Sequence, residues 1–139
     1  MSKTRKIIND PVFGFLSIPD GVLFEILQHP YLQRLNRIRQ LGLSFFVYPG
    51  AMHSRFLHSL GAMHLMREAI GSLREKGVEV TDIEATASMA AILLHDVGHG
   101  PFSHVMEHTL VDGITHEEIS LMMMEKVKGG NEDLREVMD

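Results

Sequence analysis

The feature that most constrains the fold is the apolar run from Ala85 to Leu94, which ends in the adjacent pair His95-Asp96. Apolar residues occupy every side of the helix that this run would form, and such a helix is typically buried at the centre of a domain. Thr81-Asp82-Ile83-Glu84 is a capping box, which predicts the start of the helix. Gly98-His99-Gly100-Pro101 predicts its end, so we expect His95 and Asp96 in its last turn.

Helical periodicity also dominates the rest of the chain. It predicts one all-α domain over residues 1–139, a helical bundle with a short N-terminal extended segment. We expect one helix that begins near Ser17, a second from Pro30 to a stop at Gly42, a third from Ser54 to Lys76 and a fourth that begins at Thr115. Residues 45–48 are expected to form a short strand or an apolar loop. A further helix begins near Asn131 and is cut short, which indicates the N-terminal part of a longer protein.

Composition narrows the class of function. The chain has no cysteine, so a metal ion would be held by nitrogen and oxygen ligands. The absence of a signal-peptide pattern and of a membrane-spanning apolar stretch predicts a cytoplasmic protein without a membrane partner. Five arginines and no acidic residue lie between Ile26 and Arg67, which suits an anionic ligand or, alternatively, a solvated helix face. The net charge of −5 argues against a nucleic-acid partner.

Three residues form a candidate metal site. His95 and Asp96 lie at the end of the apolar helix, and His58 lies in the preceding predicted helix. Imidazole and carboxylate are common ligands of Zn, Fe and Mn, and a His-Asp pair at a buried helix end needs a partner that offsets its desolvation. Arg55 lies three residues before His58 on the same face, within reach of a phosphate bound to the metal. Gly61, three residues after His58, leaves room for another helix or a ligand.

More histidines follow the glycine break. His99 and His104 fall in a loop that is free to wrap over a substrate. Glu107 can orient His104 and keep it protonated, as a general acid requires, although an exposed pair of little consequence is the alternative. His116 falls in the first turn of the helix that Thr115 caps, where backbone donors favour anions. Ordinary core or surface roles are expected for the remaining helical histidines, His29, His64 and His108.

The ordered set of motifs carries a family resemblance. Its most specific parts are Arg55-Phe56-Leu57-His58-Ser59-Leu60-Gly61 and the block from His95 to His104. Further matches are Ile7–Pro11, Gln33–Leu35, Arg39–Gly42, Tyr48–Ala51 and Thr115–Glu117. Over nearly the whole chain, these residues resemble the HD-domain phosphohydrolases. Among these the chain is most similar to the deoxynucleoside-triphosphate (dNTP) triphosphohydrolases, which include SAM-and-HD-domain enzymes and bacterial dGTPase-like proteins.

The resemblance implies a role for each matched residue. His58, His95 and Asp96 would bind a divalent metal ion, with Fe, Mn, Zn, Ni and Mg all open. Substrate contacts would come from Arg55, Gln40 and Leu41; the catalytic set would be His99, His104, His116 and Glu107, with His104 as the acid for the departing oxygen. The implied reaction is attack of water on the α-phosphorus, which releases nucleoside and triphosphate. The resemblance also implies a homo-oligomer.

Two departures from the family pattern bear on function. The family closes its metal site with a downstream Asp, and no residue up to Asp139 matches it, which places the fourth ligand beyond the chain. Asn9 matches an effector-site residue of vertebrate members, but Gln28 and Asn36 replace an Asp and an Arg of that site. The leading interpretation is a dNTP triphosphohydrolase. The alternatives are a phosphohydrolase for another nucleotide or phosphate ester, and a nucleotide-binding regulatory module without turnover.

Overall fold

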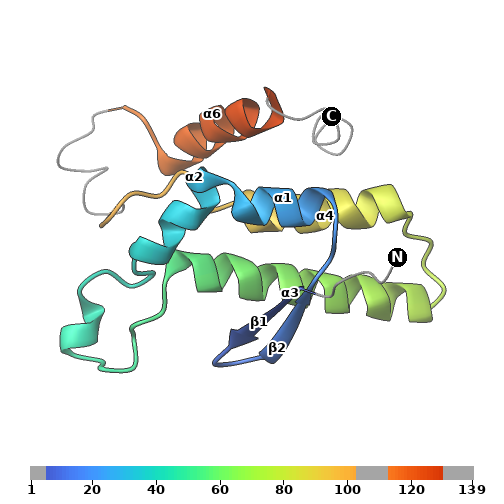
Figure 1. Ribbon diagram of the computed structural model, residues 1–139, viewed down its shortest axis with the longest axis horizontal. Coiled ribbons are helices and arrows are strands. Elements are labelled where there is room, and N and C mark those ends of the chain that lie inside the picture. The colour runs from blue at the N-terminus through green and yellow to red at the C-terminus, as the bar shows by residue number, and fades with distance from the viewer. Residues whose placement is uncertain (1–5, 103–112, 130–139) are drawn as a thin grey trace.

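The computed structural model describes residues 6–102 and 113–129. A β-hairpin precedes a set of helices, of which α3 and α4 run antiparallel through the middle of the molecule (Figure 1). The elements are β1 Lys6–Asp10, β2 Gly14–Ile18, α1 Val22–Gln28, α2 Pro30–Gln33, the 3-10 turns η1 Arg34–Arg37 and η2 Ser44–Phe46, α3 Arg55–Glu75, α4 Asp82–Leu94 and α6 His116–Gly129. The mostly helical class is confirmed. Within the described ranges, no helix is long and apolar enough to cross a membrane.

The extended N-terminal segment is an antiparallel hairpin. Asp10 Oδ1 accepts hydrogen bonds from the amides of Val12 (2.8 Å) and Phe13 (2.9 Å), which closes the turn between the strands. The register pairs Ile8 with Leu16 and leaves Leu16 buried. The predicted helix start near residue 17 was therefore wrong: this stretch belongs to β2, and α1 begins only at Val22.

The predicted helix from Pro30 to Gly42 is also too long. α2 gives way to the 3-10 turn η1, which ends at Arg37. Beyond it, Ile38 O accepts from the amide of Arg55 (2.8 Å), and the amide of Gln40 donates to His53 O (3.1 Å). This pairing removes residues 38–40 from the helix and joins them to the chain just before α3. Of the two alternatives for residues 45–48, the strand was wrong: the 3-10 turn η2 reaches residue 46, and residues 47 and 48 continue as an exposed apolar loop.

Helices α3 and α4 have the predicted local signals. Ser54 accepts a hydrogen bond from Leu57 N (3.2 Å) at the start of α3, and Gly77, with a φ of 81°, follows its end. The capping box of Thr81 and Glu84 is formed at the start of α4. α4 ends at Leu94, with His95 as its C-cap and Asp96 just beyond, so the expectation that both lie in its last turn was wrong by one to two residues.

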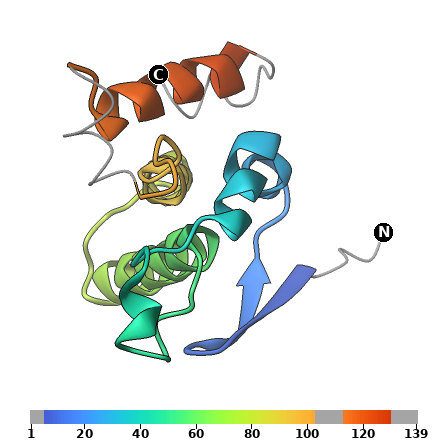
Figure 2. The same ribbon diagram turned by 90° about the vertical axis from the view of Figure 1, so that its left-hand side faces the viewer.

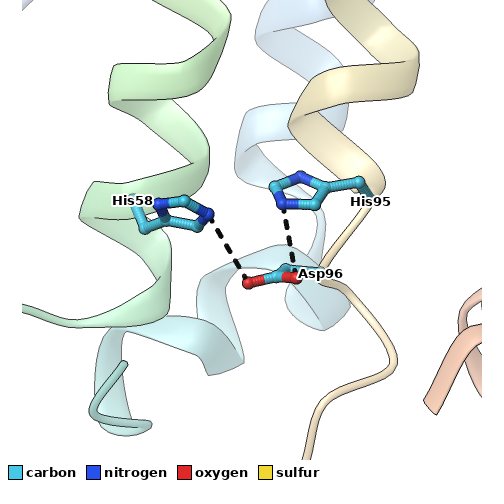
Figure 3. Close-up of side chains that lie close together, drawn as sticks. All are labelled: His58, His95 and Asp96. Atoms are coloured by element: carbon cyan, nitrogen blue, oxygen red, sulfur yellow. Dashed lines mark ion pairs between the residues drawn. The ribbon is translucent and has the colours of Figure 1, made fainter. Parts of the chain in front are cut away.

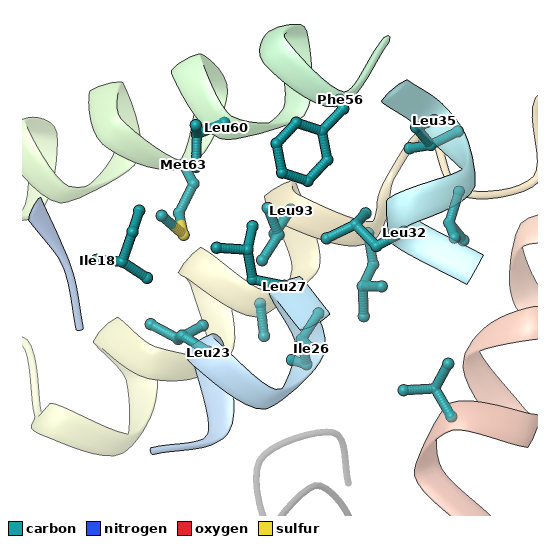
Figure 4. Close-up of a cluster of buried hydrophobic side chains, with 14 of the residues drawn as sticks. Ile18, Leu23, Ile26, Leu27, Leu32, Leu35, Phe56, Leu60, Met63 and Leu93 are labelled. Atoms are coloured by element: carbon teal, nitrogen blue, oxygen red, sulfur yellow. The ribbon is translucent and has the colours of Figure 1, made fainter. Parts of the chain in front are cut away.

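The buried core lies where α1, α2, α3 and α4 meet, with β2 and α6 closing it (Figure 4). Ile26, Leu60 and Leu93 are among its fully buried side chains. α4 lies between α3 and α6 in both views (Figures 1 and 2). Within the apolar run, Ala90, Leu93 and Leu94 are buried but Ala91 is exposed. The expectation of burial on every side was therefore wrong, but the central position of α4 is confirmed.

Candidate metal centre

The end of α4 meets the first turn of α3, and three side chains converge there (Figure 3). His95 Nε2 lies 3.3 Å from Asp96 Oδ1, and His58 Nε2 lies 3.8 Å from Asp96 Oδ2. The imidazole rings of His58 and His95 form a T-shaped, edge-to-face pair, with centroids 5.2 Å apart. One ligand atom from each residue lies within 4.8 Å of the others. The structure thus brings together all three residues that the sequence proposes as metal ligands.

Arg55 is the closest partner of Asp96. Its Nη1 donates to Asp96 Oδ2 at 2.8 Å, and both side chains are buried, with 5% and 10% of their surface exposed. The α3 helix sets this contact, because Arg55 and His58 are one turn apart on the same face. The sequence predicted a phosphate contact for Arg55. In the structure its guanidinium holds the carboxylate of the candidate metal site.

The surroundings of Asp96 keep its carboxylate charged. Burial alone would raise the pKa of Asp96, because it removes the charged form from water. A hydrogen bond from His99 and the positive charges of His95, His99 and Arg55 outweigh burial and hold this pKa well below its ordinary value. Burial lowers the pKa of His58, which favours the neutral imidazole. An ionised carboxylate and a neutral imidazole are the forms that bind metal ions.

The tautomer of His95 also fits a metal ligand. His95 Nδ1 lies 2.6 Å from Ile92 O, and a carbonyl only accepts, so Nδ1 carries the proton. In the neutral form of the ring, Nε2 then carries the lone pair on the side of Asp96. Metal-binding histidines ordinarily donate their other ring N–H in this way. The side chains of His58 and His95 are 40% and 36% exposed, so an ion and its water ligands can reach them. The donor set therefore fits a divalent cation.

His99 also contacts Asp96, at the same oxygen as His95. Its Nε2 is 3.3 Å from Asp96 Oδ1, and its side chain is only 3% exposed. The ring stacks on His116, with centroids 4.0 Å apart and an angle of 17° between the planes. The expectation that His99 lies in a loop free to wrap over substrate was wrong. The amide of His99 donates to Asp96 O (3.1 Å), which closes a tight turn and buries the ring.

The other proposed site residues fall in different parts of the chain. Backbone pairing with His53 places Gln40 beside the chain that enters α3, while the neighbouring Leu41 is half exposed. Asn9 is exposed on β1, opposite Phe15. His104 and Glu107 lie outside the described residues.

Two of the three histidines expected to have structural roles are described, and both have such contacts. His29 Nδ1 accepts from the amide of Tyr31 (3.3 Å) at the start of α2. His64 packs against the ring of Phe13, with centroids 5.0 Å apart. The same phenyl ring fills the space above Gly61, because a Cβ there would lie 2.9 Å from it. The room that the sequence predicted at Gly61 is thus taken by the hairpin turn.

Two further residues support the site, and no sequence motif singled them out for this role. Arg34 donates from Nη1 to His99 O (3.0 Å) and from Nη2 to Val97 O (2.5 Å), which holds the turn after Asp96. Ser120 on α6 is buried and contacts the same turn from the other side. A signal existed for each: Arg34 stands in the acid-free stretch, and Ser120 interrupts the apolar face of its helix four residues after His116.

A cavity adjoins the cluster on the side of the hairpin. It has a volume of about 480 Å³ and lies between α3 and the turn of the hairpin, lined in part by Phe13, His53, Leu57 and His58. Cavities of this size hold small organic ligands. His58 is therefore reachable from a space that can admit more than water.

Comparison with known proteins agrees with this geometry. Residues 55–138 match the HD domain family, and this match includes the three residues of the cluster. Because it covers more than half of the chain, the chain belongs to the HD-domain family.

Individual relatives extend the likeness to the N-terminal part. The deoxynucleoside triphosphate triphosphohydrolase SAMHD1 of Bos taurus is 38% identical, over 97% of this chain and 24% of its own length. The protein YwfO of Bacillus subtilis is 38% identical, over 84% of this chain and 26% of its own. A crystal structure of a phosphohydrolase from Bacteroides thetaiotaomicron is 62% identical, with a TM-score of 0.91, over 96% of this chain and 33% of that one. The chain thus spans about a quarter of these curated relatives and a third of the solved one.

Proposed function

We propose that the protein is a metal-dependent phosphohydrolase and that its substrates are dNTPs, which it cleaves to deoxynucleoside and triphosphate. The observation that carries this proposal is the convergence of His58, His95 and Asp96 within 4.8 Å. Relatives named as dNTP triphosphohydrolases match nearly the whole chain and support the substrate class. When bound, a divalent ion supplies Lewis acidity toward a phosphoryl oxygen and lowers the pKa of a water ligand.

The residues around the cluster have separate tasks in this proposal. Arg55 holds the carboxylate of Asp96 and adds a positive charge where a phosphate would bind. His116 lies partly buried at the start of α6, and it stacks on His99, the ring that contacts Asp96. Preoriented hydrogen-bond donors and a fixed positive charge such as that of Arg55 stabilise the charge that develops on a phosphoryl group during transfer. His104, supported by Glu107, is proposed as the acid for the departing oxygen.

The nucleoside contacts are proposed for Gln40 and Leu41. The backbone pairing of Gln40 with His53 places both residues close to the first turn of α3, from which Arg55 and His58 project. The exposed side chain of Leu41 offers an apolar surface to a sugar. Asn9 is proposed as an effector contact on the exposed face of the hairpin.

The test uses the full-length protein. Wild type, His95→Ala and Asp96→Ala are loaded with Mn²⁺, bound metal is quantified, and each dNTP is assayed separately for triphosphate release. We expect release by wild type, and a loss of at least about 100-fold in both variants, since ligands and their supporting residues each contribute on this order or more.

His64→Ala is the matched control, because His64 lies on the same helix as His58 and packs against Phe13 outside the cluster. It should retain both metal and activity. Release of monophosphate alone would show that the protein hydrolyses a different phosphate ester and not the dNTP α-phosphate. If the wild-type protein binds nucleotide but holds no metal and hydrolyses no dNTP, the proposed enzymatic function is wrong. That result would favour the nucleotide-binding regulatory module.

A further inference from the structure

One buried hydroxyl joins α6 to the turn that carries the metal-site residues. Ser120 Oγ accepts a hydrogen bond from the amide of Gly98 at 2.8 Å. The same hydroxyl donates to His95 O at 3.4 Å. Ser120 is buried, so neither contact competes with water. The backbone on both sides of Asp96 is thus tied to α6 through a single side chain.

The fit between α6 and this turn leaves no room for a side chain at Gly98. A Cβ on Gly98 would overlap the carbonyl oxygen of His116 and the amide nitrogen of Ser120. Only glycine permits this approach of two backbones. The contact therefore requires particular residues on both sides, unlike the apolar contact that Val127 makes with the core near the other end of α6.

The joint also determines where His116 lies. Ser120 follows His116 by four residues, so the two side chains share a face of α6. His116 stacks on His99, and His99 contacts Asp96. A chain of contacts therefore runs from the Ser120 hydroxyl to the carboxylate of the candidate metal centre.

We propose that Ser120 is a positioning residue, which holds the His116 ring against His99 and fixes the backbone of His95 and Gly98 around Asp96. Its effect on the histidine stack follows from the contacts alone. Its effect on turnover rests on the phosphohydrolase function proposed above. These two consequences can be measured separately.

The first measurement needs no metal and no substrate. Stacked imidazoles shift each other's ring-proton resonances, so His99 and His116 are followed by NMR in the metal-free full-length protein. In Ser120→Ala these resonances should move toward those of free imidazole. Ser59→Ala is the matched control, because Ser59 is equally buried on α3 and its hydroxyl has no hydrogen-bond partner among the described residues. Its spectrum should keep the wild-type ring shifts.

The second measurement is steady-state hydrolysis with Mn²⁺. Ser120→Ala should lose about 10–100-fold in kcat, the usual effect of removing a residue that orients site groups, with a smaller change in KM. Ser120→Cys retains the size and a weak donor and acceptor, so it should lie between Ser120→Ala and wild type, and it replaces Ser120→Ala if that variant does not fold.

Unchanged ring shifts in Ser120→Ala would overturn the proposal, as would equal losses of kcat in Ser120→Ala and Ser59→Ala. If the wild-type protein turns over no nucleotide, the proposed function fails. The NMR comparison would still decide whether Ser120 positions the histidines.

Discussion

The four side chains that contact Asp96 differ in exposure: we call the half-exposed pair, His58 and His95, its open side, and the buried pair, Arg55 and His99, its closed side. On one side, His58 and His95 present half-exposed rings, and His58 borders a cavity. On the other, Arg55 and His99 are almost fully buried and bind the same carboxylate. One carboxylate thus belongs both to an open site and to a closed polar network.

This difference in exposure suits two tasks: ligands can exchange at the open side, and the closed side holds the carboxylate of Asp96 in place. A ligand that must enter and leave, such as an ion, a water or a phosphate, needs the open side. The closed side must stay in place, because a buried carboxylate is stable only while its partners remain. Since its histidine and arginine partners keep the pKa of Asp96 low, the carboxylate is charged before any ion binds. The closed side, together with His95, therefore keeps the carboxylate ready for a cation.

Loss of Asp96 should have the largest effect, because it removes both sides at once. Asp96→Ala leaves the Arg55 guanidinium buried without its partner, and breaking a buried pair in this way costs about 3–5 kcal/mol of unfolding free energy. Metal binding should be lost as well. Urea denaturation and a Mn²⁺ titration of the full-length protein measure the two losses. A variant as stable as wild type would show that the closed side gives no support.

Asp96→Asn sharpens the electrostatic part of the comparison. Because the pKa of Asp96 is lower in the folded than in the unfolded chain, the stability it contributes is present above the unfolded value of about 3.9. That stability is lost as the pH falls through the folded pKa. The difference in unfolding free energy between wild type and Asp96→Asn should therefore be constant above about pH 5 and shrink below about pH 4. A difference that grows toward low pH would contradict this sign.

His58→Ala and His99→Ala should separate the two sides. His58→Ala removes a half-exposed ring, so we expect loss of metal binding with little change in the urea midpoint. His99→Ala removes a buried ring and a partner of Asp96, so we expect a stability loss of about 2–4 kcal/mol, as for other large buried side chains. If both variants change metal binding and the urea midpoint equally, the open and closed sides do not differ in function.

Arg34→Met tests the support behind the closed side. Its guanidinium donates to the carbonyls of Val97 and His99, and hydrogen bonds from a charged donor are each worth about 1.5–3 kcal/mol when buried. We expect the midpoint of thermal unfolding to fall and hydrogen exchange of residues 97–99 to accelerate. Arg37→Met, on an exposed arginine of the same 3-10 turn, is the control and should change neither.

The smallest effect concerns the two helix caps. Thr115→Ala and Thr81→Ala each remove one reciprocal capping interaction, and each should cost about 1 kcal/mol of stability. Only α6 carries His116 to the closed side, so Thr115→Ala alone should also disturb the His99–His116 ring shifts in NMR. A disturbance by Thr81→Ala would show that the stack depends on overall stability rather than on α6.

Local signals predicted the helical class, the caps of α3 and α4, and the three residues of the cluster. These features depend on short stretches of chain or on the donor chemistry of His and Asp, which sequence alone displays. The hairpin was missed because its strands are short and its closing turn depends on one carboxylate, that of Asp10. The end of α2 was missed because pairing of residues 38–40 with residues 53–55 outcompetes a continuing apolar period.

The sequence by itself determined that His58, His95 and Asp96 are the candidate ligands, because no cysteine competes and the spacing places them at helix ends. Only the tertiary structure decided which partners surround them. The sequence did not predict that Arg55 binds Asp96, and it expected His99 in a loop free to wrap over substrate, whereas the His99 ring is buried against the same carboxylate. Such contacts join residues about forty positions apart or depend on a tight turn, so they exist only once α3, α4 and α6 have packed together.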